Sequence, residues 1–303
     1  MSMMAATPPS NVTTSGTEHD PSAFSSPTIK YALPIDEEES KRLDLQHHIF
    51  HLSLEGKLNL APLGPELHNV LDVGTGTGFW AIDFAKLHPE TNVIGTDISA
   101  LEKPQSFLRD DLPNLSFQLA NAEEEWDFGT EFDYIHARMM QISFDDSEAV
   151  FGSAFKALRP GGWLEMQDIN ATAMSDDGSA EGSAIAGWYI RQNRLGKARG
   201  RPWNNAPNYQ RYMEEVGFED IHVEIKYWPF GGWMEDQRMK EIGKWLRINQ
   251  IEAVRAFSRG KRIEGWTKED DEAEIVAMEK EMREAKVHVY IPLYIVWGRK
   301  PLE

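Results

Sequence analysis

The stretch VLDVGTGTG at residues 70–78 decides the fold of this 303-residue chain. The apolar run at residues 69–73 predicts a short strand, and residues 79–87 predict a helix that stops before Pro89. The glycines between them allow a tight turn and a close approach of a ligand to the backbone, because no Cβ is in the way. The N–H groups that open the helix would face that ligand. The sequence therefore predicts a ligand site where a strand of an α/β sheet runs into a helix.

The spacing of the glycines separates the ligand classes that use such a turn. Dinucleotide sites prefer G-x-G-x-x-G, and the third glycine of that spacing would fall on Phe79. A P-loop is excluded because no Gly-Lys-Ser/Thr follows. The pattern is instead Asp-x-Gly-x-Gly-x-Gly, formed by Asp72, Gly74, Gly76 and Gly78. A nicotinamide-dependent oxidoreductase is therefore the disfavoured alternative.

This pattern resembles motif I of the class I S-adenosylmethionine-dependent methyltransferases. The resemblance implies that Asp72 helps to hold the ammonium end of the cofactor's methionine moiety. It also implies that the glycine turn, with Thr75 inside it, leaves room for that moiety and for the ribose.

Two further segments follow in the order that this family uses. Asp97 lies at the end of the next predicted strand, about 20 positions after the glycine turn, where an acidic residue can accept hydrogen bonds from ribose hydroxyls. We expect Asp97 and its neighbour Ile98 to bind the cofactor, and the plain alternative for Asp97 is a strand-end cap. After the third strand, the resemblance places Asn121 on the adenine amine and Ala122 beside the ring. Many relatives carry Asp where this chain has Asn121, whose amide oxygen can still accept.

The end of the fourth predicted strand carries the candidate catalytic residue. His136 is the first choice for a residue near the reactive methyl group, as a base or as a cofactor contact; the alternative is a hydrogen-bonded strand-end histidine. Arg138 could bind the cofactor carboxylate or form a surface ion pair. Asp168, near the end of the fifth strand, could face the substrate or belong to a turn. The turn at residues 158–163, LRPGGW, resembles the segment that precedes the fifth strand in these enzymes.

The rest of the chain extends this pattern into a domain. Strands alternate with helices, which predicts a mostly parallel sheet. The resemblance implies a Rossmann-like class I methyltransferase fold with seven strands, flanking helices, an N-terminal helical cap and a helical insertion before the last strand. Residues 1–30, rich in Ser, Thr, Pro and Ala, predict a disordered tail. Residues 31–303 then form one domain: a helical cap (31–62), a cofactor-binding core (63–170) and substrate-side elements with the last strands (171–303).

The chain also resembles a narrower group, the fungal LaeA-like methyltransferases of secondary metabolism, over about residues 31–301. The resemblance rests on the glycine motif and on these segments: residues 33–39, 42–48, 56–58, 122–126, 135–138 and 294–301. The group includes regulators and enzymes that tailor small natural products. On a predicted N-terminal helix, residues 36–60, Gln46 and His47 could form a lid over the cofactor. The alternative for this helix is simple packing of its apolar face on the sheet.

Composition limits the remaining possibilities. The chain has no cysteine, which excludes disulfides, cysteine-ligated zinc and thiol nucleophiles, and no other metal-ligand cluster is evident. The net charge of −18 argues against direct nucleic-acid binding; the one basic run, residues 191–201, is expected to be a solvated loop. Neither a membrane-length apolar run nor a signal peptide is found, so we expect a cytoplasmic or nuclear protein.

Together these observations predict an S-adenosylmethionine-dependent methyltransferase that acts on an oxygen or nitrogen of a small natural product. The alternative is a LaeA-like regulatory methyltransferase that works with a protein partner.

Overall fold

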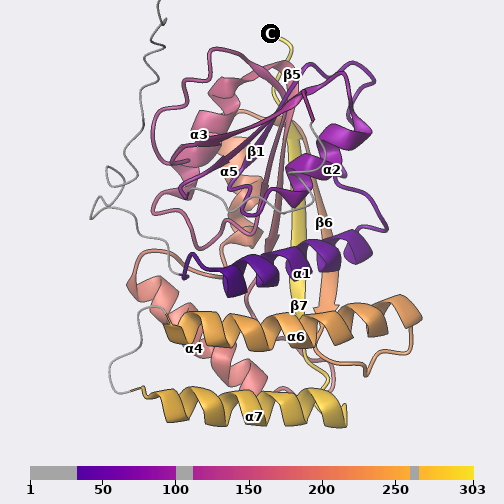
Figure 1. The fold of residues 1–303 in the computed structure, drawn as a ribbon, viewed down its shortest axis with the longest axis vertical. Helices are drawn as coiled ribbons and strands as arrows, with labels where there is room; N and C mark the ends of the chain where they lie inside the picture. The colour runs from indigo at the N-terminus through magenta and orange to yellow at the C-terminus, as the bar shows by residue number, and fades with distance from the viewer. Residues whose placement is uncertain (1–32, 100–111, 260–265) are drawn as a thin grey trace, which may run out of the picture. The chain divides into compact units, whose positions relative to one another are not determined.

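The computed structural model of the chain describes residues 33–99, 112–259 and 266–303. Seven strands form one sheet in the order β3-β2-β1-β4-β5-β7-β6 (Figure 1). The strands are β1 (Asn69–Val73), β2 (Asn92–Asp97), β3 (Leu115–Leu119), β4 (Phe132–Arg138), β5 (Leu158–Ile169), β6 (Glu219–Pro229) and β7 (Tyr290–Arg299). The first five are parallel, and β7 is antiparallel to both β5 and β6. The predicted Rossmann-like sheet is confirmed, whereas the predicted tail lies outside the described residues.

Helices cover both faces of the sheet, which explains why the central strands β1 and β4 are buried along nearly their whole length. The helices are α1 (Glu37–Ser53), α2 (Phe79–Leu87), α3 (Ser147–Ala157), α4 (Ala184–Ala198), α5 (Tyr209–Val216), α6 (Gln237–Arg259) and α7 (Lys268–Glu284). In β1, Val70 packs in a buried cluster with Trp80 of α2. The next residue, Leu71, packs on the opposite face with Phe151 of α3 and Tyr209 of α5.

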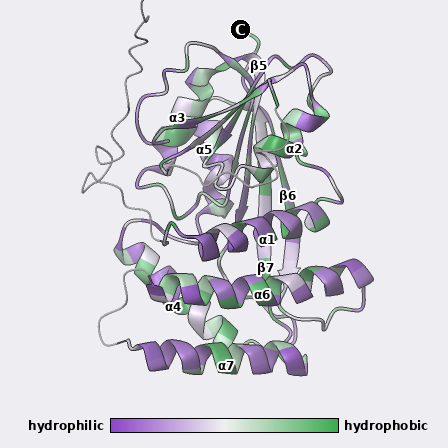
Figure 2. Cartoon of the chain, in the orientation of Figure 1, coloured by the Kyte–Doolittle hydropathy of each residue, from purple (hydrophilic) through white to green (hydrophobic). Residues whose placement is uncertain are grey.

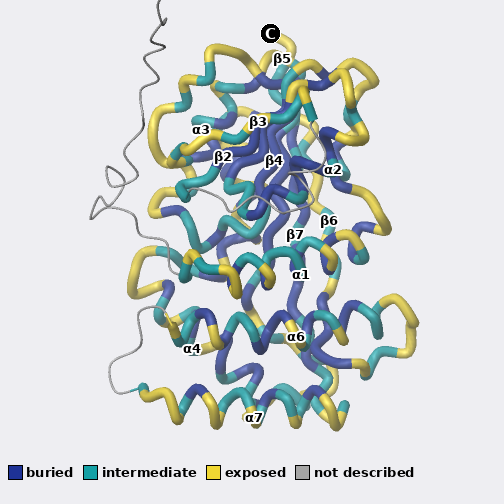
Figure 3. The backbone as a smooth tube through the Cα atoms, in the orientation of Figure 1, coloured by how far each residue is buried: buried dark blue, intermediate teal, exposed yellow. Residues whose placement is uncertain are grey.

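A separate group of helices lies beyond the carboxyl ends of the parallel strands. There α1 packs on α6, and α7 packs on both α6 and α4 (Figure 1). Their shared apolar cluster includes Ile169 at the end of β5 and the buried Trp188, Trp203 and Trp228. Figure 2 shows that α7 is largely hydrophilic, and Figure 3 shows the central strands buried and much of α7 exposed. The predicted N-terminal helical cap and the helical insertion between β6 and β7 are thus present.

The basic run at residues 191–201 is not the solvated loop that its charge pattern predicted. Its first eight residues belong to α4, because Ser183 caps that helix and apolar Trp188 and Tyr189 face the core. Arg191 pairs with Glu274 and lies over the ring of Trp266. The run therefore contributes helix structure and ion pairs.

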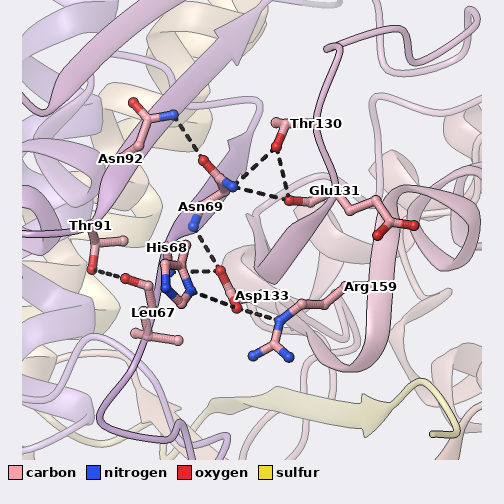
Figure 4. A network of polar contacts seen from close by, with 9 residues as sticks. All are labelled: Leu67, His68, Asn69, Thr91, Asn92, Thr130, Glu131, Asp133 and Arg159. Carbon is pink, nitrogen blue, oxygen red and sulfur yellow. Dashed lines mark hydrogen bonds and ion pairs between the residues drawn. The ribbon is translucent and has the colours of Figure 1, made fainter.

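A buried carboxylate fastens the strands at their amino ends, opposite the predicted ligand site (Figure 4). Asp133 of β4 accepts the backbone N–H groups of His68 and Asn69, at 2.8 and 2.7 Å, and pairs with Arg159. Burial raises the pKa of Asp133, but these hydrogen bonds and the Arg159 charge outweigh it and hold the pKa below its usual range. Asp133 thus aligns β1 with β4 and leaves their carboxyl ends in register.

Among the described residues, no helix combines the length and apolar composition that a membrane crossing needs.

Candidate active site

The glycine turn between β1 and α2 has the backbone geometry that its sequence predicts. Gly74, Gly76 and Gly78 all have positive φ, and Gly78 is the N-cap of α2. A Cβ on Gly76 would meet only Leu43 Cδ1, at 3.5 Å, whereas a Cβ on Gly74 would collide with the side chain of Met140. The turn is therefore open at Gly76 and closed by Met140 at Gly74.

Asp72 lies at the carboxyl end of β1 and is held from two sides. His136 Nδ1 on the neighbouring strand donates to Asp72 Oδ1 at 2.8 Å, and the Thr75 hydroxyl donates to Asp72 Oδ2. Register explains the first contact, because Asp72 and His136 are direct cross-strand partners. The structure therefore joins three of the predicted site residues.

His136 itself is fully enclosed. Its ring is 0% exposed and stacks on Trp80 with centroids 3.8 Å apart, and its Nε2 has no hydrogen-bond partner. A general base must come within hydrogen-bond reach of the proton that it removes. In this arrangement His136 contacts Asp72 rather than the space above the glycine turn. The geometry thus favours the strand-end alternative over direct proton transfer.

Asp97 ends β2 beside the glycine turn. Its carboxylate accepts from the Gly76 N–H at 3.0 Å and from the Ser99 N–H and hydroxyl at 3.0 and 2.8 Å. Burial raises the pKa of Asp97, and the hydrogen bonds from Ser99 and Gly76 oppose that rise. Ile98 follows directly and is half-buried. An ionised carboxylate offers about four acceptor positions, so Asp97 can still accept from a hydroxyl.

The segment after β3 meets the same edge. The Ala120 N–H donates to the Asp97 carbonyl at 2.9 Å, which brings residues 120–123 next to the end of β2. Asn121 is exposed, and its side-chain oxygen accepts the Glu123 N–H at 3.1 Å. Ala122 is half-buried, and its carbonyl accepts from Trp126 Nε1. Asn121 and Ala122 thus lie near Asp97 on the carboxyl side of the sheet, and their contact with the adenine stays a prediction.

Helix α1 covers the glycine turn, and we call it the lid helix. Leu43 faces Gly76, and the Thr77 side chain donates to the Asp44 carboxylate. His47 accepts from Arg138 at 3.1 Å through Nδ1, and its Nε2 lies 3.0 Å from Asp83 of α2. The other side of α1 packs on α6, and Phe50 packs edge-on against Trp228 of β6 with ring centroids 4.9 Å apart, so the expected packing of this helix on the sheet is present. A lid formed by Gln46 and His47 over the cofactor stays a prediction.

Asp44 is a site residue that the sequence reasoning missed. Burial raises the pKa of Asp44, the Thr77 hydrogen bond opposes that rise, and Oδ1 is buried without a partner among the described residues. A buried acceptor without a donor costs free energy, which makes Asp44 a candidate ligand contact. An acidic residue next to Leu43 on an otherwise packed helix was the available signal.

Arg138 ends β4 below the lid helix. Its guanidinium lies 4.5 Å from the centre of the Phe50 ring. Burial lowers the pKa of Arg138 to about 10, and the charges of Asp72 and Asp83 oppose the shift. Arg138 therefore keeps its positive charge at neutral pH, at the same edge of the sheet as Asp72.

The two ends of the lid helix are held differently. At its start, Arg259 of α6 pairs with Asp36 at 3.3 Å and with Glu38 at 2.8 Å, and Arg259 is a third exposed. In the segment that follows its end at Ser53, the fully buried carboxylate of Glu165 accepts the N–H groups of Leu60 and Ala61, at 2.9 and 2.7 Å. The first turn thus carries exposed ion pairs, but a buried hydrogen bond from Asn249 of α6 to the Arg42 carbonyl, at 3.1 Å, already holds the next turn.

Asp168 is buried on the α5 face of the sheet. It accepts from the Tyr209 hydroxyl at 2.7 Å and from the Gln141 N–H at 3.4 Å. Burial raises the pKa of Asp168 to about 7, against the effect of these hydrogen bonds. Asp168 therefore supports the loop after β4, which carries Met140, and it does not face solvent.

These residues fit S-adenosylmethionine. The open backbone at Gly76 admits a ligand, and Asp44 Oδ1 is an unused buried acceptor next to it. Asp72 and Asp97 bring negative charge to the same edge, where the ammonium and the ribose hydroxyls need acceptors. Within the described ranges, no three His, Asp or Glu side chains gather as a metal ion requires.

Comparison with known proteins identifies the family. A model of the methyltransferase domain matches residues 45–223, and the chain belongs to this family. The chain is 34% identical to probable methyltransferase tdiE of Emericella nidulans, over 87% of this chain and 82% of that protein. It is 31% identical to the secondary metabolism regulator laeA of Aspergillus fumigatus, over 90% of this chain and 73% of that protein. The chain is therefore an S-adenosylmethionine-dependent methyltransferase with relatives in fungal secondary metabolism.

A solved structure shares the fold. The crystal structure of the cyclase SpnF superposes with a TM-score of 0.52 at 16% identity, covering 85% of this chain and 82% of that one. At this identity the likeness concerns the fold alone.

Proposed function

We propose that this methyltransferase transfers the methyl group of S-adenosylmethionine to an oxygen or nitrogen of a small natural product. The observation that carries the proposal is the cover over the glycine turn: Leu43 and Asp44 of the lid helix lie against Gly76 and Thr77. An enclosed site suits a small acceptor, because a side chain on the surface of a folded protein would have to pass beneath the lid helix.

Each predicted residue has a role in this proposal. Bound S-adenosylmethionine supplies an electrophilic methyl group on a sulfonium sulfur. Asp72 accepts from the ammonium group, and Asp97 accepts from the ribose hydroxyls. Arg138 binds the carboxylate, which it can reach by exchanging its bond to His47.

The remaining roles concern the adenine, the fit of the turn and the orientation of Asp72. Asn121 and the Ala122 N–H bind the adenine, with Ile98 packing beside it. Gly74, Thr75 and Gly78 shape the turn. His136 acts as a positioning residue: its Nδ1–H holds Asp72 Oδ1, and Trp80 fixes the ring. Rate enhancement then comes mainly from placing the acceptor in line with the methyl group.

A second function is favoured by one observation, the likeness to laeA over 90% of the chain. In that case the cofactor site serves a regulator of secondary-metabolite genes that acts with a protein partner.

Transfer of radiolabelled methyl groups separates the two. The purified chain is incubated with methyl-labelled S-adenosylmethionine and, in parallel, with the small-molecule and the protein fractions of a related fungal culture. We expect label in the small-molecule fraction, and none with the Gly76→Val variant. Label confined to the protein fraction would favour the regulator, and label in neither fraction would contradict both.

A further inference from the structure

The sheet ends in a long strand with an open edge. Strand β6 (Glu219–Pro229) pairs with β7 on one side, and no other strand of the described chain pairs with its outer side (Figure 1). Such an edge presents a row of unpaired N–H and C=O groups, which another strand can join. The open edge therefore offers a place for β-sheet extension.

One face of this edge strand is apolar and exposed. Val223, Ile225 and Tyr227 alternate along β6 and so point to the same face, with 38%, 41% and 48% of their surfaces exposed. Neighbouring large apolar side chains on one exposed surface mark interaction sites. The apolar stripe runs directly along the open edge.

The opposite face carries two charges of opposite sign. Glu224 and Lys226 lie between the apolar residues and form an ion pair at 2.7 Å within the strand. Their side chains remain 44% and 25% exposed. A partner strand with the same two residues in reverse order would therefore match this face.

We propose that β6 pairs in an antiparallel manner with β6 of a second copy of this chain, about a twofold axis at Ile225. Ile225 then lies opposite Ile225 of the second copy. Glu224 lies opposite Lys226, and Val223 lies opposite Tyr227, each in both directions, as a twofold interface requires. Directly opposed pairs of opposite charge, and of aromatic with β-branched residues, both stabilise antiparallel strands. The two sheets become one continuous sheet.

Other positions of the twofold axis along β6 bring less favourable pairs of residues together. In an antiparallel pair, directly opposed side chains lie on the same face of the sheet. A twofold axis between two identical strands must therefore pass beside one residue, which then lies opposite the same residue of the second copy. An axis at Glu224 opposes two carboxylates, and an axis at Lys226 opposes two ammonium groups. An axis at Val223 opposes Tyr227 with Glu219, beyond the irregular pairing between Glu219 and His222. The axis at Ile225 alone among these matches charge and apolar character together.

Cysteine crosslinking tests the register. Because the chain contains no cysteine, the variant Ile225→Cys carries a single thiol that would face its own copy across the axis. Mild oxidation should convert it to a covalent dimer. Val223→Cys should crosslink poorly alone but readily when mixed with Tyr227→Cys. Val276→Cys, on the 67% exposed position of α7, is the control for random collisions. Crosslinking of Ile225→Cys no faster than that of Val276→Cys overturns the proposal.

Charge reversal tests the pairing without oxidation. Wild-type protein should sediment near twice its monomer mass of 34.5 kDa. Glu224→Lys and Lys226→Glu should each sediment as monomers, because like charges then oppose each other, and an equimolar mixture of the two should regain the dimer mass. Thermal unfolding checks that both variants fold. A monomeric wild type, or a mixture that stays monomeric while both variants are folded, rules out the proposed dimer.

Discussion

The carboxylate of Asp97 accepts a hydrogen bond from the backbone N–H of Gly76, at 3.0 Å. This contact joins the end of β2 to the centre of the glycine turn, so the acidic residue and the open backbone form one site. The Ser99 N–H and hydroxyl fix the other oxygen of the carboxylate. The proposed ribose acceptor is thus held in place before any ligand arrives.

Replacing Asp97 with alanine should weaken cofactor binding. Loss of a hydrogen bond to a charged group costs about 1.5–3 kcal/mol, or roughly 10- to 150-fold in Kd. Isothermal titration with S-adenosylmethionine measures the change, and Glu90→Ala, at an exposed turn position, is the control. Unchanged affinity in a folded variant would remove Asp97 from the site.

The Gly76→Val substitution should abolish cofactor binding while the chain still folds. The new side chain fills the open part of the turn, and the positive φ of +57° adds strain of about 1–2 kcal/mol. Gly129→Val is the matched control, since Gly129 has a similar φ of +67° with nothing near its Cβ position. Titration and thermal unfolding are measured for both variants. If both lose binding equally, strain rather than occlusion is the cause.

Asp44→Ala should change stability and affinity in opposite directions. Removing a half-buried carboxylate with an unpartnered oxygen relieves a desolvation cost, so we expect Tm to stay level or rise. Loss of the acceptor should weaken S-adenosylmethionine binding by about tenfold. Calorimetry follows both quantities in one set of samples. An Asp44→Ala protein that binds normally would show that Asp44 serves only the lid helix.

Asp168→Asn should alter how stability depends on pH. Burial raises the folded-state pKa of Asp168 to about 7, so ionisation opposes folding. The contribution of Asp168 to the free energy of unfolding is greatest below about pH 4, the pKa of the residue in the unfolded chain. This contribution falls as pH rises and levels off above about pH 7. The asparagine variant lacks this loss, so its unfolding free energy relative to wild type should increase from pH 4 to pH 8, by roughly 1–4 kcal/mol. Denaturant unfolding at several pH values checks this, and parallel curves for the two proteins would contradict it.

Local patterns predicted the elements around the glycine turn well. Residues 69–73 and 79–87 form the strand and helix that their apolar runs indicated. The order of the strands could not be predicted, because periodicity shows which face is buried and not which strand lies beside it. The same limit affected residues 191–201, where the partners of Arg191 are Glu274 of the distant α7 and Trp266 in the segment before that helix.

The candidate site residues at the ends of the parallel strands could be predicted from the sequence. The candidate that the lid helix contributes could not. The glycine spacing pointed to Asp72 and Asp97 because strand ends in one parallel sheet meet at one edge. For Asp44 the only sequence signal was an acidic residue beside Leu43, and its place in the site depends on a helix crossing above Gly76. His136 was identified as a site residue, but its contact with Asp72 depends on cross-strand register and its burial against Trp80 depends on how α2 packs.

The unequal fastening of the lid helix has a consequence for turnover. The spent cofactor must leave after each methyl transfer, and the route past Gly76 runs beneath Leu43. Glu165 holds the segment after the helix and Asn249 holds the Arg42 carbonyl, both through buried hydrogen bonds, so only the first turn, where Arg259 pairs with Asp36 and Glu38, is held by exposed charges. Exposed ion pairs weaken as ionic strength rises. A rise in the salt content of the surrounding solution should therefore loosen the first turn of the helix without moving Leu43 away from Gly76.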